Sequence, residues 1–249
     1  MLVAPEGLPR IEAGDDLAEI FLAALAGEGL ALADGDIVAV AQKLVSKAEG
    51  RLVRLADVCP GPAALELAAE SGKDPRLAEL ILSESSEVMR VRTGFIIVRH
   101  RLGLVLANAG IDQSNIDHEG AESALLLPVD PDASAAALGK ALRARTGAEV
   151  GVVIIDSIGR AWRNGAIGTA IGVAGMPALL DLRGVHDLFG RPLATSELGL
   201  ADEVAAAASI LMEQAAEGRP MVLLRGLAMS AGAGRASDLV RNRAMDLFP

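Results

Sequence analysis

The apolar run from Gly151 to Ile155 is the feature that most constrains how this chain folds. Four β-branched residues follow a glycine and end at Asp156, which predicts a short buried strand. Similar runs at 37–41 and 221–225 predict two more strands. The stretch 159–175 is rich in glycine, and we interpret it as a loop. Asp156 is therefore expected where a buried strand runs out into a loop.

Segments with apolar residues at helical spacing lie between these strands. It predicts helices over 16–30, over 62–90 with a second helix starting at Pro75, over 133–147 and over 199–216. Two β-rich runs at 95–98 and 102–106 predict a hairpin, and a polar loop follows over 108–115. Strands and helices alternate without a regular βαβ rhythm. We therefore expect an α+β fold with mixed sheets and flanking helices, rather than a doubly wound α/β fold.

Composition narrows the possible functions. Hydrophobic residues make up 51% of the 249 residues, aromatics only 2%, and there is no Tyr, so the core is aliphatic. The formal net charge of −10 and the scarcity of aromatic rings argue against binding nucleic acid or an anionic membrane. One Cys, Cys59, excludes an intramolecular disulfide and a multi-Cys metal site. No signal peptide or membrane-length apolar run is apparent, so we expect a cytoplasmic protein.

Two aspartates are candidate metal ligands. Asp156 is followed by Ser157, and oxygen donors of this kind suit Mg²⁺ or Mn²⁺. Asp112 lies in the second polar loop, after another apolar strand. The alternative is that Asp156 caps a turn, that Ser157 bonds the backbone and that Asp112 forms an Asx-turn.

Basic residues near these aspartates are candidate phosphate ligands. Arg160 and Arg163 flank the only Trp, Trp162, soon after Asp156, and guanidinium groups suit phosphate. Lys43 and Lys47 follow an early strand and could also neutralise phosphate. The alternatives are a core Trp162 and solvated basic side chains.

Glycines at 165, 168, 172 and 175 could admit a ligand close to the backbone. They match neither a Walker A loop nor a dinucleotide-binding fingerprint. No G-x-S-x-G nucleophile elbow is present, and the three His residues show no metal-ligand spacing. Covalent hydrolase chemistry is disfavoured.

Several ordered motifs resemble the coenzyme F-420-0:L-glutamate ligase family over almost the whole chain. They comprise the segments 7–9, 14–16, 35–36, 45–50, 108–115, 127–132, 156–165, 170–175, 201–203 and 214–218. The resemblance implies one ligase domain over 1–249 with two sub-lobes, an intertwined homodimer and no C-terminal nitroreductase-like domain.

The resemblance also implies an activity: GTP-dependent addition of L-glutamate to a phosphorylated deazaflavin acceptor, through an acyl phosphate. It implies Mg²⁺ or Mn²⁺ at two sites and K⁺. Asp112 and Asp156 would hold one metal, and Ser157 and Gln214 the second. Lys47, Arg160 and Arg163 would be catalytic. The implied GTP-binding residues are Leu8, Pro9, Arg10, Ile11, Gln42, Lys47, Asn115, Met212, Glu213, Gln214, Ala215, Ala216, Glu217, Gly218 and Arg219.

The sequence departs from the family pattern at two places. Ala166-Ile167-Gly168 stands where the family usually carries Gln-Thr-Asp, which removes polar groups worth about 0.5–1.5 kcal/mol each when hydrogen-bonded. Glu213 stands where Gly is usual before the Gln, and a carboxylate there would repel phosphate. A glutamyl ligase for another cofactor precursor, or a non-catalytic nucleotide-binding homologue, stays open at this point.

Overall fold

The chain is built around a five-stranded sheet. The computed structural model describes residues 1–116, 120–213, 215–227 and 232–246. The strand order is β1-β12-β2-β8-β9, and only β2 and β8 run parallel. The bounds are β1 Leu2–Val3, β2 Ile37–Ala41, β8 Gly151–Arg160, β9 Arg163–Ala174 and β12 Met221–Leu224.

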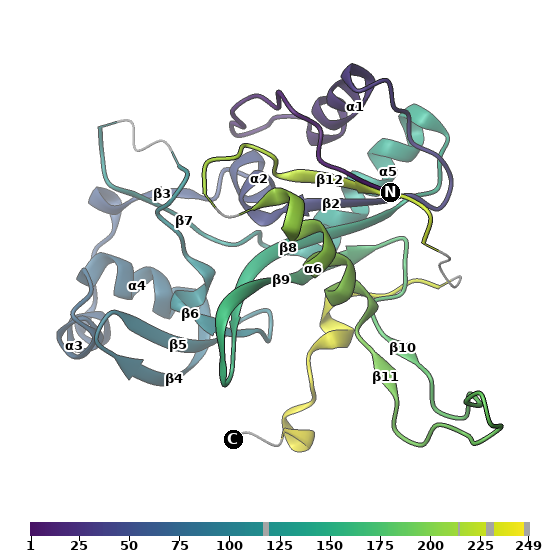
Figure 1. The fold of residues 1–249 in the computed structure, drawn as a ribbon. Helices are drawn as coiled ribbons and strands as arrows, with labels where there is room; N and C mark the ends of the chain where they lie inside the picture. Colours follow the sequence, from purple (N-terminus) through teal and green to yellow (C-terminus); the bar gives the residue numbers. More distant parts are fainter. Residues whose placement is uncertain (117–119, 214, 228–231, 247–249) are drawn as a thin grey trace.

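Alternate residues of the central strands face two different cores. In β2, Val38 and Val40 pack with α1, α2 and α5, whereas Ile37 and Ala39 pack with α6 on the opposite face. Figure 1 shows α6 crossing the front of the sheet, with α1 and α5 behind it. The bounds are α1 Leu17–Gly27, α2 Gln42–Ala48, α5 Pro131–Thr146 and α6 Leu200–Met212. Both cores are aliphatic apart from Phe21, as the composition predicts.

The remaining elements lie around this sheet. Helices α3 Pro62–Ser71 and α4 Pro75–Ser83 pack on a three-stranded sheet of β4 Ser85–Arg92, β5 Phe95–His100 and β6 Val105–Ala107. Two small sheets pair β3 Leu52–Arg54 with β7 Ser123–Leu125, and β10 Leu180–Asp181 with β11 Glu197–Leu198. Short 3-10 turns are η1 Leu55–Asp57, η2 Asn108–Gly110, η3 Ala236–Leu239 and η4 Arg243–Met245.

The predicted α+β class is confirmed, together with the three apolar strands and the β5–β6 hairpin. The helix expected from Asp16 begins one residue later, because the Asp16 side chain accepts a hydrogen bond from the Glu19 N–H as its N-cap. The short helix α2 directly follows β2 and was not predicted from the sequence. No helix among the described residues is both long enough and apolar enough to cross a membrane.

The helix expected over 62–90 is wrong beyond residue 83. Residues Ser85–Arg92 form β4, whose side chains alternate between more and less buried positions, as an edge strand requires. Val88 and Val91 favour this extended conformation. The strand pairs with β5 across a turn in which Gly94 has a φ of 85°. Pairing with the next strand therefore overrides a pattern that also suited a helix.

The loop expected over 159–175 is wrong as well. Strand β8 continues past Asp156 to Arg160, and β9 returns along it as the edge of the main sheet. A Cβ at Gly168 would lie 2.5 Å from the Ala205 carbonyl oxygen of α6, and one at Gly172 would lie 2.4 Å from the Pro131 oxygen of α5. These glycines let two helices pack directly on β9, and they do not form a ligand-binding loop.

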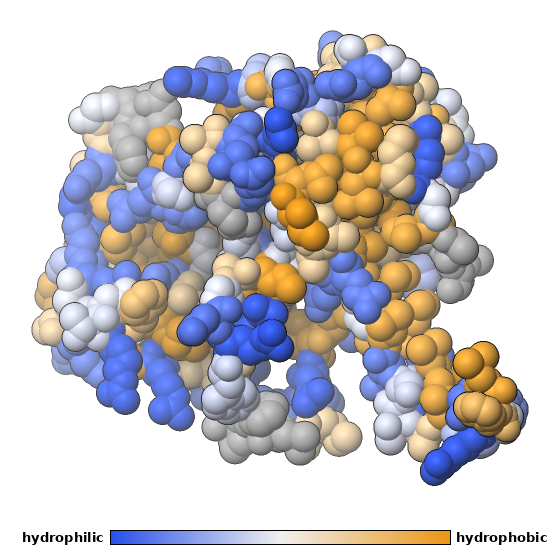
Figure 2. Space-filling model, in the orientation of Figure 1, coloured by the Kyte–Doolittle hydropathy of each residue, from blue (hydrophilic) through white to orange (hydrophobic). Residues whose placement is uncertain are grey.

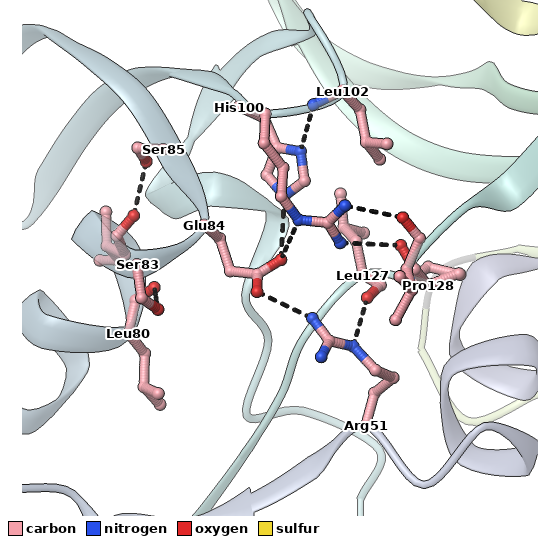
Figure 3. A network of polar contacts seen from close by, with 12 residues as sticks. Arg51, Leu80, Ser83, Glu84, Ser85, His100, Leu102, Leu127 and Pro128 are labelled. Atoms are coloured by element: carbon pink, nitrogen blue, oxygen red, sulfur yellow. Dashed lines mark hydrogen bonds and ion pairs between the residues drawn. The ribbon is translucent and has the colours of Figure 1, made fainter.

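A buried carboxylate, Glu84, joins the α3–α4 region to the segment after α2 (Figure 3). Arg51 Nη2 donates to Glu84 at 2.8 Å and its Nε donates to the Leu127 carbonyl at 2.9 Å. Arg101 Nε donates to Glu84 at 3.1 Å. His100 Nε2 lies 3.4 Å from the same carboxylate, while Nδ1 accepts the Leu102 N–H. The Nε2 side of the imidazole thus faces Glu84, although the two atoms form no hydrogen bond.

The charges around Glu84 hold it ionised. Burial raises its pKa, but the contact with His100, the hydrogen bond from Arg51, and the charges of Arg51 and Arg101 outweigh burial and lower the pKa to about 2. We name Glu84, Arg51, His100 and Arg101 the Glu84 cluster. This cluster connects separate segments of the fold, and we call such a cluster a structural tie. It contains more positive than negative charge.

Candidate active site

The candidate site lies at the carboxyl ends of the parallel strands β2 and β8. The last residue pair between them is Ala41 with Ile155, after which β2 leads into α2 and β8 continues through Asp156. The carboxyl ends of adjacent parallel strands are where open sheets commonly bind ligands. Asp156 is partly buried at this edge.

Asp112 is held at the same place by contacts from α2 and from its own loop. Lys43 Nζ lies 2.6 Å from Asp112 Oδ2 and donates to Ser114 Oγ at 2.9 Å. The Ser114 N–H donates to Asp112 Oδ1 at 2.7 Å. This hydrogen bond forms the Asx-turn that was the alternative interpretation of Asp112. Asp112 also pairs with Leu125 through two backbone hydrogen bonds. The aspartate is therefore fixed from three directions.

The charge of Asp112 affects the pKa of Asp156. Burial raises the pKa of Asp156, the Asp112 charge raises it further, and the result is about 6 even though the Ser157 N–H and Lys43 lower it. Burial also raises the pKa of Asp112, but there the hydrogen bonds from Lys43 and Ser114 outweigh burial and lower it. We name Asp112, Asp156 and Lys43 the Asp156 cluster. It needs more positive charge than Lys43 supplies.

These residues fit a divalent metal. Asp112 and Asp156 present carboxylate oxygens, which Mg²⁺ and Mn²⁺ prefer, and the Lys43 ammonium already stands as a cation on Asp112. No group of three or more His, Cys, Asp or Glu suited to a metal occurs among the described residues. Two carboxylates leave several coordination positions for water or phosphate, as is usual for Mg²⁺ at substrate phosphates.

Ser157 lies on the opposite face of the sheet from Asp156. It pairs across the hairpin with Gly168, which contacts α6, so its side chain is on the α6 face of the sheet and not on the Asp156 face. A single metal bound by both side chains is therefore disfavoured. The other predicted ligand of a second metal, Gln214, lies outside the described residues.

Three segments predicted to bind nucleotide meet beside the Asp156 cluster. Lys47 Nζ donates to the Asn115 carbonyl at 2.8 Å, and Asn115 Nδ2 donates to the Ala215 carbonyl at 2.9 Å. The Gly14 N–H donates to the Ala48 carbonyl at 2.8 Å, which ties the N-terminal loop to the end of α2. Arg219 forms an ion pair with Glu6 at 2.7 Å. Segments far apart in sequence thus form one region.

Comparison with known proteins gives the family. Residues 7–226 match the family described as F420-0:gamma-glutamyl ligase. The chain belongs to this family. The coenzyme F420:L-glutamate ligase of Methanothermobacter thermautotrophicus is 47% identical over 249 residues, covering 99% of this chain and 98% of the relative.

Two other relatives carry the same name. The protein of Methanocaldococcus jannaschii is 44% identical over 215 residues, covering 86% of this chain and 85% of the relative. The protein of Methanopyrus kandleri is 43% identical over 243 residues, covering 96% and 93%. The resemblance to F420-0:gamma-glutamyl ligases seen in the motifs is confirmed.

The other nucleotide-binding positions implied by the family differ in exposure. Pro9 and Arg10 are exposed, and Leu8 is partly buried against the core. Ile11 is buried in that core, and Gln42 is buried with its Oε1 accepting from Ser46 Oγ at 2.9 Å. Near the other end of the region, Met212 and Arg219 are partly buried, whereas Ala215, Ala216, Glu217 and Gly218 are exposed. The exposed positions are the ones from which a side chain or backbone can reach a nucleotide directly.

Glu213 ends α6 with an unusual backbone conformation. Its φ is 55° and its ψ is −159°, a region that glycine occupies at little cost and other residues rarely adopt. The glycine that the resemblance leads us to expect at this position would adopt this conformation without strain, independently of charge. The helix predicted to extend to residue 216 stops at Met212 for the same reason.

Arg160 and Arg163 lie at the tip of the β8–β9 hairpin, where they pair with each other across the strands. Four residues separate Arg160 from Asp156 along β8, a distance of about 13 Å. Both are exposed, and Trp162 between them is 79% exposed with a φ of 57°, so the alternative of a core Trp162 is wrong. The structure does not bring the two arginines to the aspartates.

Lys43, which the sequence suggested only as a phosphate ligand, makes the shortest contact with Asp112 in the cluster. Its position directly after a buried strand was the feature of the sequence that could have indicated this contact. Cys59 is exposed and free, His100 belongs to the Glu84 cluster, and His186 is exposed. The third histidine, His118, lies outside the described residues.

Proposed function

We propose that this chain joins L-glutamate to coenzyme F420-0, a phosphorylated deazaflavin, with GTP as the co-substrate. Membership of the F420-0:gamma-glutamyl ligase family and near full-length identity to relatives named for F420 and L-glutamate support the reaction. The structural observation that carries it is the meeting of Asp112 and Asp156 beside Lys43. Such a site suits the transfer of a charged phosphoryl group.

The proposed reaction proceeds through an acyl phosphate. A carboxylate oxygen of the acceptor attacks the γ-phosphorus of GTP, and the bond from that phosphorus to the GDP oxygen breaks. The glutamate amine then attacks the acyl carbon, inorganic phosphate leaves with the bonding electron pair, and the amine gives its proton to solvent. Activation is needed because a carboxylate is a poor electrophile.

Residues of the chain orient the participants. Asp112 and Asp156 would hold Mg²⁺ or Mn²⁺, which when bound neutralises charge on the transferring phosphate. Ser157 and Gln214 are proposed for a second divalent ion, and K⁺ is proposed as an additional cation. Lys43 and Lys47 are proposed to contact phosphate oxygens. Holding amine and acyl phosphate together replaces a bimolecular encounter.

The two hairpin arginines take a modified role in this proposal. Because Arg160 and Arg163 lie about 13 Å along the strand from Asp156, they are proposed to contact a distal part of the acceptor and not the γ-phosphate. The Gly168 departure does not require another acceptor, since the close approach of α6 accounts for that glycine.

We further propose a homodimer with two-lobed subunits. An arm formed by residues 179–198 extends away from the main sheet, and its tip carries Leu188 and Phe189 at 99% and 95% exposure. The apolar tip is visible at the lower right of Figure 2, as is an apolar surface over α6, where Ile210 is 74% exposed. A second copy would cover such surfaces. Light scattering of Phe189→Asp against wild type tests this, with a monomer expected for the variant.

The ligase proposal is tested by mass spectrometry of the protein incubated with F420-0, L-glutamate, GTP, Mn²⁺ and K⁺. A product heavier by glutamyl units, with GDP and phosphate, is expected. Label from γ-labelled GTP should end in free phosphate. Release of pyrophosphate, or equal turnover without nucleotide, would contradict the acyl-phosphate route.

A further inference from the structure

A partly open cavity of about 220 Å³ lies at the free edge of β9. It is lined by the β5–β6 turn, by Thr169 and Ala170 of β9, by the start of α6 and by the C-terminal segment. In Figure 1 that segment, drawn in yellow, runs below α6. Neither the family motifs nor the proposed mechanism assigns a role to this cavity.

Thr169 connects the cavity to the proposed chemistry. It is the cross-strand partner of Asp156, and directly opposed residues of an antiparallel pair have Cβ atoms about 4.5–5.5 Å apart on the same face. A small molecule in the cavity would therefore lie about one residue pair from the carboxylate proposed to hold the phosphate-bound metal.

Charged side chains of both signs line the cavity. Arg99 and Arg241 supply two cations, while Asp202 and Asp246 supply two anions. Asp202 Oδ1 accepts the Ala170 N–H at 2.9 Å, which fixes this carboxylate at the sheet edge. Burial raises its pKa, so its charge is poorly compensated.

Arg99 has an unused donor. Its side chain is 18% exposed, and Nε lies 3.6 Å from Glu87 Oε2, too far for a hydrogen bond. This buried Nε has no hydrogen-bond partner within the part of the chain that the structure describes. Buried donors are nearly always satisfied, so an unsatisfied one in a cavity wall indicates a missing acceptor.

We propose that this cavity binds the amino-acid substrate, L-glutamate, with its carboxylates at Arg99 and Arg241 and its ammonium group at Asp202. The inference rests on the proposed ligase function. The cavity is smaller than the roughly 300–1,000 Å³ of pockets for drug-sized ligands, so it suits neither a nucleotide nor a deazaflavin. A phosphodiester of the acceptor could form ion pairs with the two arginines, but Asp202 would repel it.

Steady-state kinetics of single variants test the assignment. Arg241 is exposed, so Arg241→Gln should fold normally. We expect it to raise KM for L-glutamate at least about 10-fold, since a charge-assisted hydrogen bond is lost, while KM for GTP and for F420-0 stays unchanged. Asp202→Asn retains an acceptor for the Ala170 N–H and is expected to raise the same KM. Arg243→Gln is the matched control, because Arg243 follows closely in the chain but pairs with Glu87 outside the cavity wall.

The outcomes separate this inference from the proposed function. If the wild type forms product and Arg241→Gln leaves KM for L-glutamate unchanged, the cavity assignment fails and the ligase function stands. If only KM for F420-0 rises, the cavity belongs to the acceptor and the glutamate assignment is again overturned. If the wild type forms no product, the proposed function fails. In that case calorimetric titration of wild type and Arg241→Gln with L-glutamate still decides the cavity, with binding expected only for the wild type.

Discussion

Two buried carboxylate clusters in this molecule differ in how their charge is balanced. Glu84 is surrounded by Arg51, Arg101 and His100, and its pKa is lowered to about 2. Asp156 lies beside another carboxylate, and its pKa is raised to about 6 by burial and by Asp112. Both are carboxylates removed from water, yet their neighbours push them in opposite directions.

The difference separates a structural tie from a candidate site. The Glu84 cluster has its counter-charges in place without any ligand, because Arg51 and Arg101 donate hydrogen bonds to the one carboxylate and His100 faces it. The Asp156 cluster has two carboxylates and one ammonium, so its negative charge is not fully balanced. Perturbed carboxylates that lack a counter-charge are more typical of binding sites than of structural ties.

The largest effect is expected from Asp156→Asn. Turnover should fall at least about 1,000-fold, equivalent to about 4 kcal/mol, because the proposed metal that neutralises phosphate charge would lose a ligand. The free energy of unfolding of the metal-free protein at neutral pH should rise, since an uncompensated charge is removed. Product formation and urea unfolding measure the two quantities.

Asp57→Asn is the matched control, because Asp57 is an exposed carboxylate paired with Arg54 away from both clusters. It should leave turnover and stability close to wild type. Loss of stability in Asp156→Asn with normal turnover would assign Asp156 to the structural class and break the comparison.

The opposite pattern is expected from Glu84→Gln. Removing the carboxylate leaves Arg51 and Arg101 partly buried without their counter-charge, and the free energy of unfolding should fall by about 3 kcal/mol. Turnover per folded molecule should stay within about 2-fold of wild type. In Glu87→Gln, which removes more exposed ion pairs, the loss of stability should be below about 1 kcal/mol. A catalytic defect in folded Glu84→Gln would contradict a purely structural role.

The next expectation concerns pH. The folded-state pKa of Asp156 is raised, so its contribution to stability is present at low pH and lost as pH rises through about 6. For Glu84 the pKa is lowered, so its contribution is present above the unfolded value of 4.5 and lost as pH falls through about 2. In a carboxyl-carbon NMR titration, Asp112→Asn should lower the pKa of Asp156 without restoring the ordinary value, because burial is the larger cause. An unchanged pKa would show that the two aspartates do not interact.

Local sequence was enough to predict the central strands and most helices. Apolar runs such as 37–41 and 151–155 identify strands because a strand that is buried on both faces consists of consecutive apolar residues. The role of Gly168 and Gly172 was not predictable, because their close partners lie on α6 and α5. A glycine needed for helix packing looks the same in sequence as one needed for a loop.

The candidate site was predictable in its acids and less so in its geometry. Asp112 and Asp156 were chosen from their positions after strands, and the structure brings them within reach of each other's charge. The contact of Lys43 with Ser114 spans 71 residues, so only the fold reveals it. Arg160 was placed beside Asp156 by sequence proximity, but an extended strand carries it away.

The smallest effect concerns backbone strain, which occurs beside the candidate site and not in the Glu84 cluster. Among the described residues, Asn115 and Glu213 have positive φ next to the Asp156 cluster, whereas the four members of the Glu84 cluster do not. Glu213→Gly should relieve this strain, and the gain exceeds the entropy that glycine adds to the unfolded chain by about 1 kcal/mol.

That gain corresponds to a rise of about 2–4 °C in the melting temperature for a chain of this size. Glu213→Ala is the matched control, because it removes the carboxylate but keeps a Cβ at a φ of 55°. If calorimetry shows the same rise for both variants, charge repulsion and not backbone conformation is the cause. A rise confined to Glu213→Gly would show that backbone strain is located beside the candidate site and would sharpen the contrast with the unstrained Glu84 cluster.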